Sequence, residues 1–344
     1  MATLNQTMKA RGNKMNISVI KSHGSKNDFI IIDEQKGLIV NDEQRAQLAL
    51  YLCDRQKAIG ADGILYITES GSAQAKMRVF NSDGSEASMC GNGLRCAARY
   101  IAERDGVQKF SVETMKAVLA VEKVESLYED IPTYAVEISP ILFDLASLPL
   151  QLNQETLFNQ IVPEWHDTLR FSALAVPNPH LITQVTEKEL ISGLQQELAQ
   201  SLNAPNQWFT DGVNVSFVVP LDQNQIFVRT FERGVGFTSA CGTAMSSSSL
   251  IQAMLTNGET GIPIDVYNDG GRVKCVIHKK EDQFHHIDLI GNATFTDEYT
   301  LEFNDNELIP SVKHVKSTGE EIIYQRMAEA SKEFIWGHIP GLRK

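Results

Sequence analysis

The chain has little of what three large protein classes require. Its 344 residues contain no apolar run that approaches the roughly 20 residues of a membrane-spanning helix. The five cysteines are odd in number and scattered, so they form no disulfide framework and fit a reducing cytoplasm. Acidic residues outnumber basic ones by 43 to 31, and the net charge of −12 argues against a nucleic-acid or anionic-membrane partner. Composition therefore favours a soluble globular protein that is long enough for two domains.

Sequence motifs for metals and nucleotide cofactors are also missing. Zinc needs about four ligands, yet Cys90 and Cys96 lie six residues apart on a predicted helix, with no Cys-x-x-Cys or paired histidine motif beside them. The stretch 91–93 is too short for a dinucleotide fingerprint, and 234–236 precedes no pyrophosphate-binding turn. We therefore predict no metal and no cofactor.

An internal repeat relates the two halves of the chain. Cys90 and Cys241 each precede a glycine, and they are 151 residues apart (241 minus 90). The same offset joins Asn27 to Asn178, Phe80 to Phe231, and residues 61–67 to 212–218. Each half therefore delivers one thiol from an equivalent position.

Both halves combine short strands with helices. We expect helices over residues 43–57 and 94–103 in the first half, and over 187–202 and 242–255 in the second. Runs of β-branched and aromatic residues between them predict strands, which end at Gly- and Asn-rich turns. These patterns predict an α+β fold of two pseudo-symmetric domains, each a curved, mostly antiparallel sheet wrapped around a central helix.

The repeat also predicts the domain boundaries. The first domain spans 15–132, with the chain returning to it at about 296–303, and the second spans 133–295. Residues 304–344 have no counterpart in the first half and form a C-terminal extension. Within it, 319–335 has the pattern of an amphipathic helix that packs on the protein or forms a dimer contact. Residues 1–14 lack the apolar core of a secretory signal, and we expect a tail there.

A cysteine followed by glycine at the start of a helix is a candidate acid–base group. The ordinary thiol pKa of about 8.5 falls to roughly 3.5–7.5 at a helix N-terminus or beside a cation. The residues that follow, 91–93 and 242–243, leave backbone N–H groups exposed, and these donors form an anion site that suits a carboxylate. A single buried cysteine is more often an inert small hydrophobe, but the repeat supplies two at equivalent positions.

Two such loops on opposite sides of a cleft would place the α-carbon of an amino acid between two sulfurs. Removal of the α-hydrogen builds negative charge on the carboxylate, and donors aimed at developing charge usually make the largest electrostatic contribution to such a step. One thiolate acts as general base and the opposing thiol as general acid, so the stereocentre inverts. Cys90 and Cys241 are the predicted catalytic residues, and the scheme needs no cofactor.

Several motifs resemble those of the diaminopimelate epimerase family. Residues 81–96, which include Met89-Cys90-Gly91-Asn92-Gly93, resemble the family's first signature. Residues 231–236 and 240–243 resemble its second signature. Similarity to the lesser motifs extends to residues 24–29, 178–180 and 213–215, so that the resemblance covers about residues 17–303.

The resemblance implies a fold, an activity and a set of site residues. The family converts LL-diaminopimelate to the meso form without a cofactor, in lysine and peptidoglycan precursor synthesis, and often forms homodimers. By resemblance, Cys90 and Cys241 are the two acid–base thiols. The reacting carboxylate would be held by Gly91, Asn92, Gly242 and Thr243. The distal amino-acid end would be bound by Asn27, Asn81, Asn178, Asn214, Glu232 and Arg233.

The residues of the distal set suit a second amino-acid head group. Arg233 can grip a carboxylate through a bidentate fork, and Glu232 can pair with an ammonium group. Asparagine side chains offer both donors and acceptors. His180, which follows Asn178-Pro179, is interpreted as an ordinary hydrogen-bonded loop histidine.

Three positions depart from the family pattern. Phe237 stands where members usually have an acidic residue, Ala244 where they usually have glycine, and Gly63 where some have glutamine. Two alternatives stay open: a racemase of another amino acid, such as histidine or proline, on the same fold, and a non-catalytic amino-acid-binding module. Glu232 and Arg233 favour a substrate with two amino-acid heads, and the retention of both cysteines argues against a binding module.

Overall fold

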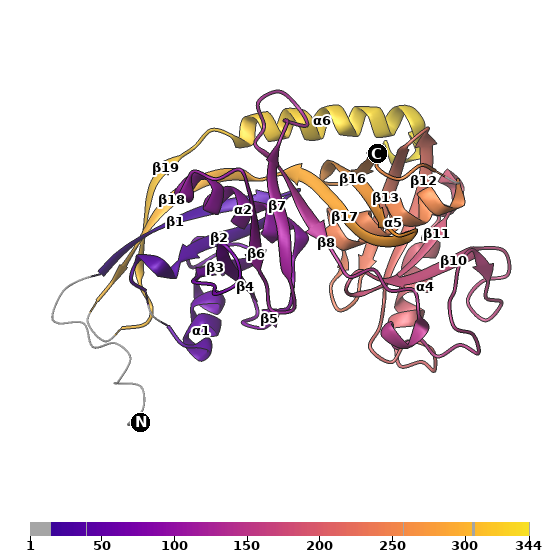
Figure 1. Ribbon diagram of the computed structural model, residues 1–344, viewed down its shortest axis with the longest axis horizontal. Helices are drawn as coiled ribbons and strands as arrows, with labels where there is room; N and C mark the ends of the chain where they lie inside the picture. The colour runs from indigo at the N-terminus through magenta and orange to yellow at the C-terminus, as the bar shows by residue number, and fades with distance from the viewer. Residues whose placement is uncertain (1–14, 39, 257, 305–306, 344) are drawn as a thin grey trace. The chain divides into compact units, whose positions relative to one another are not determined.

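The computed structural model describes residues 15–343, apart from 39, 257, 305 and 306 (Figure 1). The predicted tail over residues 1–14 lies outside this range. The chain divides into two compact units. Unit 1 comprises Met1–Val136 and Asn292–Tyr324, and unit 2 comprises Glu137–Gly291 and Gln325–Lys344.

Unit 1 is built from a mostly antiparallel sheet. Its strands are β1 (Met15–Gly24), β2 (Asn27–Asp33), β3 (Gly63–Thr68), β4 (Ala75–Asn81), β5 (Glu86–Ala87), β6 (Lys109–Glu113), β7 (Val118–Val124), β8 (Thr133–Ile138, which begins in this unit), β18 (Thr294–Phe303) and β19 (Ser311–Ser317). Its helices are η1 (Glu34–Lys36), α1 (Asp42–Leu52) and α2 (Gly91–Asp105). The strands pair in the order β19-β18-β1-β2-β3-β4-β6-β7-β8, and β2–β3 and β4–β6 are the parallel pairs in it.

Unit 2 has the same plan. Its strands are β9 (Gln160–Ile161), β10 (Arg170–Ala175), β11 (Pro179–Gln184), β12 (Asn214–Asp222), β13 (Gln225–Glu232), β14 (Gly236–Phe237), β15 (Ile264–Asn268), β16 (Gly271–Lys280) and β17 (Gln283–Asn292). Its helices are η2 (Leu145–Ser147), α3 (Glu187–Ile191), α4 (Leu194–Asn203), α5 (Gly242–Leu255) and η3 (Pro340–Leu342). The strands pair in the order β9-β10-β11-β12-β13-β15-β16-β17, with β11–β12 and β13–β15 parallel.

The strand registers of the two units match residue by residue. Phe29 lies opposite Gly63 in the β2–β3 pair, and His180 lies opposite Asn214 in β11–β12. His180 follows Phe29, and Asn214 follows Gly63, by the same 151 residues that separate the two cysteines (180 minus 29, and 214 minus 63). The internal repeat read from the sequence is therefore a repeat of topology and register.

One helix in each unit is wrapped by its sheet, as predicted. Helix α2 contacts β1, β2, β3, β4 and β7, and α5 contacts β10, β11, β12, β13, β15 and β16. Residues 91–102 of α2 and 242–251 of α5 are all buried. A helix that is buried on every side needs small residues where strands approach closely. Four consecutive serines, 246–249, meet this need in α5, and three of them donate their hydroxyls to carbonyl groups four residues earlier.

The C-terminal segment contributes residues to each of the two units. Strand β19 pairs with β18, and α6 (Glu321–His338) follows it. In unit 1, Tyr324 is fully buried and packs edge-on against His23, with a centroid distance of 4.4 Å. In unit 2, Phe334 stacks on Tyr267 at 4.5 Å, and Ile335 and Ile339 join the hydrophobic core. The amphipathic helix predicted over 319–335 is thus a packing helix within the chain.

One predicted helix is divided in two. We expected a single helix over 187–202, but α3 ends at Ile191 and α4 begins at Leu194. Gly193 lies between them with a φ of 88°, a left-handed conformation that glycine adopts without steric cost. Among the described residues, no helix is long and apolar enough to cross a membrane.

Candidate functional site

Cys90 occupies the N-cap of the central helix in unit 1. Its backbone is extended, with a φ of −146° and a ψ of 112°, and its Sγ accepts a hydrogen bond from the backbone N–H of Gly93 at 3.4 Å. A Cβ atom on Gly93 would lie 2.9 Å from Cδ2 of Leu65, so a larger residue here would need the Leu65 side chain to move. The sulfur is therefore held at the positive end of the α2 dipole, where a thiolate is stabilised.

The side chain of Asn27 lies against this thiol. Its Oδ1 accepts hydrogen bonds from Cys90 Sγ at 3.6 Å and from Asn92 Nδ2 at 3.3 Å. Its Nδ2 donates to Oδ2 of Asp62 at 2.7 Å. Asp62 is held in turn by Arg55, whose guanidinium also makes a two-pronged contact with Asp28. This network fixes which end of the Asn27 amide faces the sulfur.

Asn92 is oriented by a buried arginine. Nη2 of Arg95 donates to Oδ1 of Asn92 at 3.0 Å and to Oγ of Ser25 at 3.2 Å. Nε of Arg95 donates to the carbonyl of Asn292 at 3.1 Å. Because Arg95 is completely buried, these contacts hold it in place and leave the amide nitrogen of Asn92 directed toward Asn27.

Cys241 takes the N-cap position of α5 in unit 2. Its φ of −113° and ψ of 112° repeat the extended conformation of Cys90, and its Sγ lies 3.5 Å from the Thr243 hydroxyl. Burial raises the pKa of this thiol well above its ordinary value, and the nearby carboxylate of Glu232 adds to that increase. The sequence predicted a lowered thiol pKa at a helix start; here burial and a neighbouring negative charge outweigh the helix dipole.

Glu232 lies beside Cys241 at the end of β13. Burial raises the pKa of its carboxyl group, while hydrogen bonds from Thr238 and Cys241 act in the opposite direction. Because the pKa of Cys241 lies well above its ordinary value, this thiol keeps its proton at neutral pH.

The remaining predicted residues of unit 2 gather at the start of β11 and β12. Asn214 is buried; its Oδ1 accepts from the backbone N–H of Arg233 at 3.0 Å, and its Nδ2 has no hydrogen-bond partner among the described residues. Nη1 of Arg233 donates to the carbonyl of Asp211 at 2.9 Å. Asn178 Oδ1 lies 3.1 Å from Nε2 of His180. A buried donor without a partner, close to a guanidinium-bearing residue, suits an anionic ligand.

His180 is not the loop histidine that the sequence suggested. It lies within β11 and is completely buried, and burial lowers its pKa to about 3, with a smaller contribution from the charge of Arg233. The ring is therefore neutral at pH 7, with its Nδ1 unpaired among the described residues. The short run Leu181-Ile182-Thr183, which is rich in apolar and β-branched residues, was the available signal for a buried strand.

Asn81 is the predicted site residue with the simplest local role. It ends β4, and its Nδ2 donates to Oγ of Ser85 at 3.0 Å across the polar loop. Its backbone lies opposite Gly63 in the β3–β4 pair. Of the three departures from the family pattern, Gly63 has a steric explanation: a Cβ atom there would lie 2.5 Å from the carbonyl oxygen of Phe80.

The other two departures lie on either side of Cys241. Phe237 is 45% exposed, and its ring packs edge-on against Phe231 at 5.2 Å with the Arg229 guanidinium 5.3 Å from its centroid. Ala244 is fully buried in the first turn of α5. Phe237 therefore presents an aromatic surface close to the second thiol in sequence, where family members usually carry a negative charge.

Asp62, Arg95 and Thr238 support the site and were not predicted. Each contacts a predicted residue through its side chain: Asp62 contacts Asn27, Arg95 contacts Asn92, and Thr238 contacts Glu232. Two signals in the sequence could have indicated these roles: Asp62 lies in the turn 60–63, and Arg95 lies in the first signature. Neither was sufficient, because a charged residue in a turn or helix is more often a surface group.

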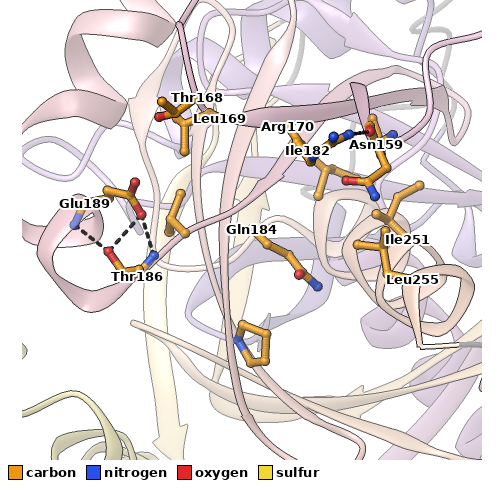
Figure 2. A pocket seen from close by; sticks show the side chains of 13 residues that line it. Asn159, Thr168, Leu169, Arg170, Ile182, Gln184, Thr186, Glu189, Ile251 and Leu255 are labelled. Atoms are coloured by element: carbon orange, nitrogen blue, oxygen red, sulfur yellow. Dashed lines mark hydrogen bonds between the residues drawn. The ribbon is translucent and has the colours of Figure 1, made fainter. Parts of the chain in front are cut away.

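Two pockets lie in unit 2. The larger, of about 700 Å³, is lined by residues that include Asn203, Gly212 and Arg233, so it reaches one predicted binding residue. The other, of about 450 Å³, is shown in Figure 2 and contains none of the predicted site residues in its lining. Two of its polar residues, Thr186 and Glu189, form a helix capping box. Of these two pockets, the one beside Arg233 is therefore the one with a predicted binding residue in its lining.

The cysteines differ in environment. All five are free thiols. Burial raises the pKa of Cys53 and of Cys96 to about 12 each, so these two stay protonated, and neither occupies the N-cap of a helix. Cys275 is buried in β16. The two cysteines at helix N-caps are thus the pair that the fold singles out.

Solved structures identify the fold class. A PhzF-family phenazine biosynthesis protein from Bacillus anthracis is 16% identical, has a TM-score of 0.58, and matches over 83% of this chain and 99% of its own. A hydroxyproline epimerase from Agrobacterium vitis is 13% identical, has a TM-score of 0.54, and matches over 87% of this chain and 94% of its own. These likenesses confirm the predicted two-domain α+β fold.

Sequence comparison gives the family. The family model named diaminopimelate epimerase matches residues 19–127 and 172–296. A diaminopimelate epimerase from Listeria monocytogenes serotype 4a is 51% identical over 326 residues, which are 93% of this chain and 98% of the relative. One from Enterococcus faecalis is 49% identical over 287 residues, covering 82% of this chain and 88% of the relative. The chain therefore belongs to the diaminopimelate epimerase family.

Proposed function

We propose that this protein is an isomerase that interconverts LL- and meso-diaminopimelate without a cofactor, in the synthesis of lysine and peptidoglycan precursors. Cys90 and Cys241 are its two acid–base thiols. Family membership supports the substrate. The observation that carries the mechanism is that each unit places one cysteine at the N-cap of its buried central helix, in the same extended conformation.

The reaction is a proton exchange at one α-carbon. One cysteine, as thiolate, takes the α-proton, and the electron pair of the C–H bond moves toward the carboxylate. The second cysteine, as thiol, gives its S–H proton to the opposite face of the carbon and becomes the thiolate. No electrons leave the substrate, and the enzyme ends with the two protonation states exchanged.

The helix starts supply the stabilisation that this step needs. The first N–H groups of a helix have no partner within it, so those of Gly91, Asn92, Gly242 and Thr243 are suited to the reacting carboxylate. As the α-proton leaves, negative charge grows on that group, and fixed donors act on it without reorganisation. The raised pKa of Cys241 supports its assignment as the thiol that starts with a proton.

The distal head group defines the substrate. Arg233 and the unpaired Nδ2 of Asn214 together suit its carboxylate, and the adjoining pocket provides space. Glu232, which lies beside Cys241, would serve the distal ammonium as well as the protonation of that thiol. We assign Asn27, Asn81 and Asn178 to the same binding set, with Asn27 also contacting Cys90.

Location and assembly follow from the proposed chemistry and family. A two-thiol reaction requires reduced cysteines, which favours a cytoplasmic location. The family resemblance favours a homodimer, and sedimentation velocity would measure that state directly. We also propose that the two domains have the limits predicted from the repeat, namely 15–132 with a return at about 296–303, and 133–295, followed by the extension 304–344.

The first experiment is incubation of the reduced protein with LL-diaminopimelate in deuterium oxide. Chiral chromatography should detect the meso form, and mass spectrometry should detect deuterium at the α-carbon. Cys90→Ala and Cys241→Ala should each lose turnover while circular dichroism stays that of the folded protein. Faster exchange into histidine or proline than into diaminopimelate would contradict the substrate assignment, and turnover by either cysteine variant would contradict the two-thiol mechanism.

A further inference from the structure

The outer surface of the β16–β17 hairpin carries a cluster of metal-ligating side chains in unit 2. His278 and His286 lie directly opposite each other in the antiparallel pair. Asp288 is two residues beyond His286 on the same strand, so its side chain is on the same face. The inner face of the hairpin carries Cys275, Ile277, Ile287 and Leu289, which are all buried.

The ligand atoms of these three residues converge. Nε2 of His278 lies 2.8 Å from Oδ2 of Asp288, and Nε2 of His286 lies 3.7 Å from Oδ1 of the same carboxylate. The two imidazole rings are stacked, with centroids 4.4 Å apart and planes 9° apart, so the two Nε2 atoms are directed at one carboxylate. One ligand atom from each residue lies within 4.8 Å of the other two.

Two imidazoles directed at one carboxylate are a different arrangement from the usual single His–Asp pair on a protein surface. An isolated His–Asp hydrogen bond uses one ring, whereas here a second imidazole directs its Nε2 at the same carboxylate while its Nδ1 lies 2.8 Å from Nδ1 of His285. A zinc ion binds imidazole nitrogen and carboxylate oxygen at about 2.0–2.2 Å, so small rotations of these partly exposed side chains would bring all three onto one ion. The ion would replace the proton that now joins His278 to Asp288.

We propose that His278, His286 and Asp288 form a site for a divalent transition-metal ion, of which zinc fits best. Two imidazoles and one carboxylate form a borderline donor set that favours zinc over magnesium or calcium, which prefer all-oxygen sites. A water molecule would complete the tetrahedron. Because the ligands come from two strands, the ion would clamp β16 to β17 beside the register shift that follows His278.

The site has a structural consequence that is separate from epimerisation. Strand β16 packs against α5, the helix whose N-cap is Cys241. A ligand that binds the folded state alone stabilises it, so zinc should raise the melting temperature of unit 2. The proposal does not rest on the proposed function, and it stands or fails independently of turnover.

The test is zinc titration of the metal-free, full-length Cys90→Ala/Cys241→Ala protein, in which the N-cap thiols cannot bind the ion. Calorimetry should show one saturable site, and His278→Asn or His286→Asn should weaken it more than about tenfold, since even loss of an outer partner of a ligand costs 10–100-fold. Cobalt should give the visible absorption of a four- or five-coordinate site.

His314→Asn is the matched control, because His314 pairs with Asp297 at 3.1 Å and has no second imidazole on that carboxylate. It should leave zinc affinity unchanged. Equal affinity in the Cys90→Ala/Cys241→Ala protein and in both hairpin variants made from it, or no saturable binding at all, would overturn the proposal. Circular dichroism of each variant, together with the zinc-dependent rise in melting temperature, separates loss of the site from loss of the fold.

Discussion

The Cys90 thiol donates a hydrogen bond to Oδ1 of Asn27 across a sulfur–oxygen distance of 3.6 Å. The amide can present its oxygen to the sulfur because its nitrogen is held by Asp62 at 2.7 Å. If the Asn27 amide were reversed, its nitrogen would face the sulfur and its oxygen would face a carboxylate. Asp62 therefore selects the orientation of Asn27, and Asn27 selects where the proton of Cys90 points.

Asp62→Asn should lower kcat for epimerisation about 10- to 100-fold, because a displacement of about 1 Å in an acid–base group has that cost. KM should also rise, since Asn27, whose amide Asp62 orients, belongs to the proposed substrate-binding set. The pH dependence of kcat should also shift, which a purely structural residue would not cause. The measurement is steady-state kinetics over pH with diaminopimelate.

Asp54→Asn is the control for this variant. Asp54 lies just before the same turn and pairs at the surface with Lys57 at 2.9 Å. It should retain normal kcat and an unchanged pH profile. Identical behaviour of the two variants would remove Asp62 from the positioning of Cys90.

Glu232 and Cys241 give a second prediction, about thiol reactivity. Burial and the Glu232 charge raise the pKa of Cys241, whereas the Thr243 hydroxyl lowers it. Glu232→Gln should therefore lower the pKa of Cys241 and speed its alkylation at pH 7, by about tenfold for each pKa unit removed. Thr243→Val should act in the opposite direction.

The measurement is the pH dependence of iodoacetamide labelling, followed at each cysteine by mass spectrometry. The pH midpoint reports the pKa separately from access to the thiol. Cys90 provides the internal comparison, because it belongs to the other unit and should label with an unchanged midpoint in both variants. A Cys241 midpoint that does not move in Glu232→Gln would show that the carboxylate does not control this thiol.

The sequence was most informative where chemistry depends on local pattern. Cys-Gly at a strand–helix junction predicted both N-caps, because the N-cap conformation and the first turn are set by adjacent residues. The 151-residue offset predicted the shared topology. When every residue of one half has its counterpart at the same offset, the pairing of neighbouring strands can be the same in both halves. The central helices thus follow from local patterns, whereas the shared strand order follows from comparing the two halves of the chain.

The parts that could not be predicted depend on contacts between distant residues. Asp62 reaches Asn27 across 35 positions, and Arg95 reaches the carbonyl of Asn292 across 197. The raised pKa of Cys241 depends on burial, which a motif does not report. The break at Gly193 was missed because an isolated glycine is often tolerated within a helix. The pairing of His278 with His286 was not predicted, because the two residues become neighbours through the register of the β16–β17 hairpin.

His180 gives a prediction about stability and pH. Its pKa is about 3 in the folded protein, against an ordinary value of 6.5. Between these two values the unfolded chain binds the proton more readily, so stability is lost as pH falls below 6.5 and is unaffected above it. From pH 7.5 to pH 5 the loss from this residue should be about 2 kcal/mol, at 1.36 kcal/mol per pH unit below 6.5.

Urea unfolding followed by tryptophan fluorescence tests this loss, because Trp165, Trp208 and Trp336 all belong to unit 2, as His180 does. His180→Gln keeps an N–H donor for Asn178 and should reduce the pH dependence by the stated amount. His285→Gln removes an exposed histidine of the same unit and should not reduce it. An equal pH dependence in wild type and His180→Gln would contradict the buried neutral ring.

The last prediction concerns the anchoring of the C-terminal segment in unit 1. Arg99 is 6% exposed, its Nη2 donates to Glu320 at 2.7 Å, and its guanidinium lies 3.8 Å from the ring centroid of Phe295. Glu320 also accepts from the backbone N–H of Phe295 at 3.0 Å, so one carboxylate ties the start of α6 to β18 and α2. Glu320→Ala leaves a buried cation without this partner and should destabilise unit 1 by about 3 kcal/mol.

Amide hydrogen exchange in β18, β19 and α2 measures this loss of stability within unit 1, independently of the tryptophans of unit 2. Glu298→Ala is the matched control, because Glu298 pairs with Lys316 at 3.1 Å on the surface, where such a pair contributes about 0–1 kcal/mol. Exchange should accelerate strongly in Glu320→Ala and little in Glu298→Ala. Similar rates in the two variants would mean that Arg99 is satisfied by Glu103 and the Ala293 carbonyl alone, and that the C-terminal segment is held by apolar packing of Tyr324 instead.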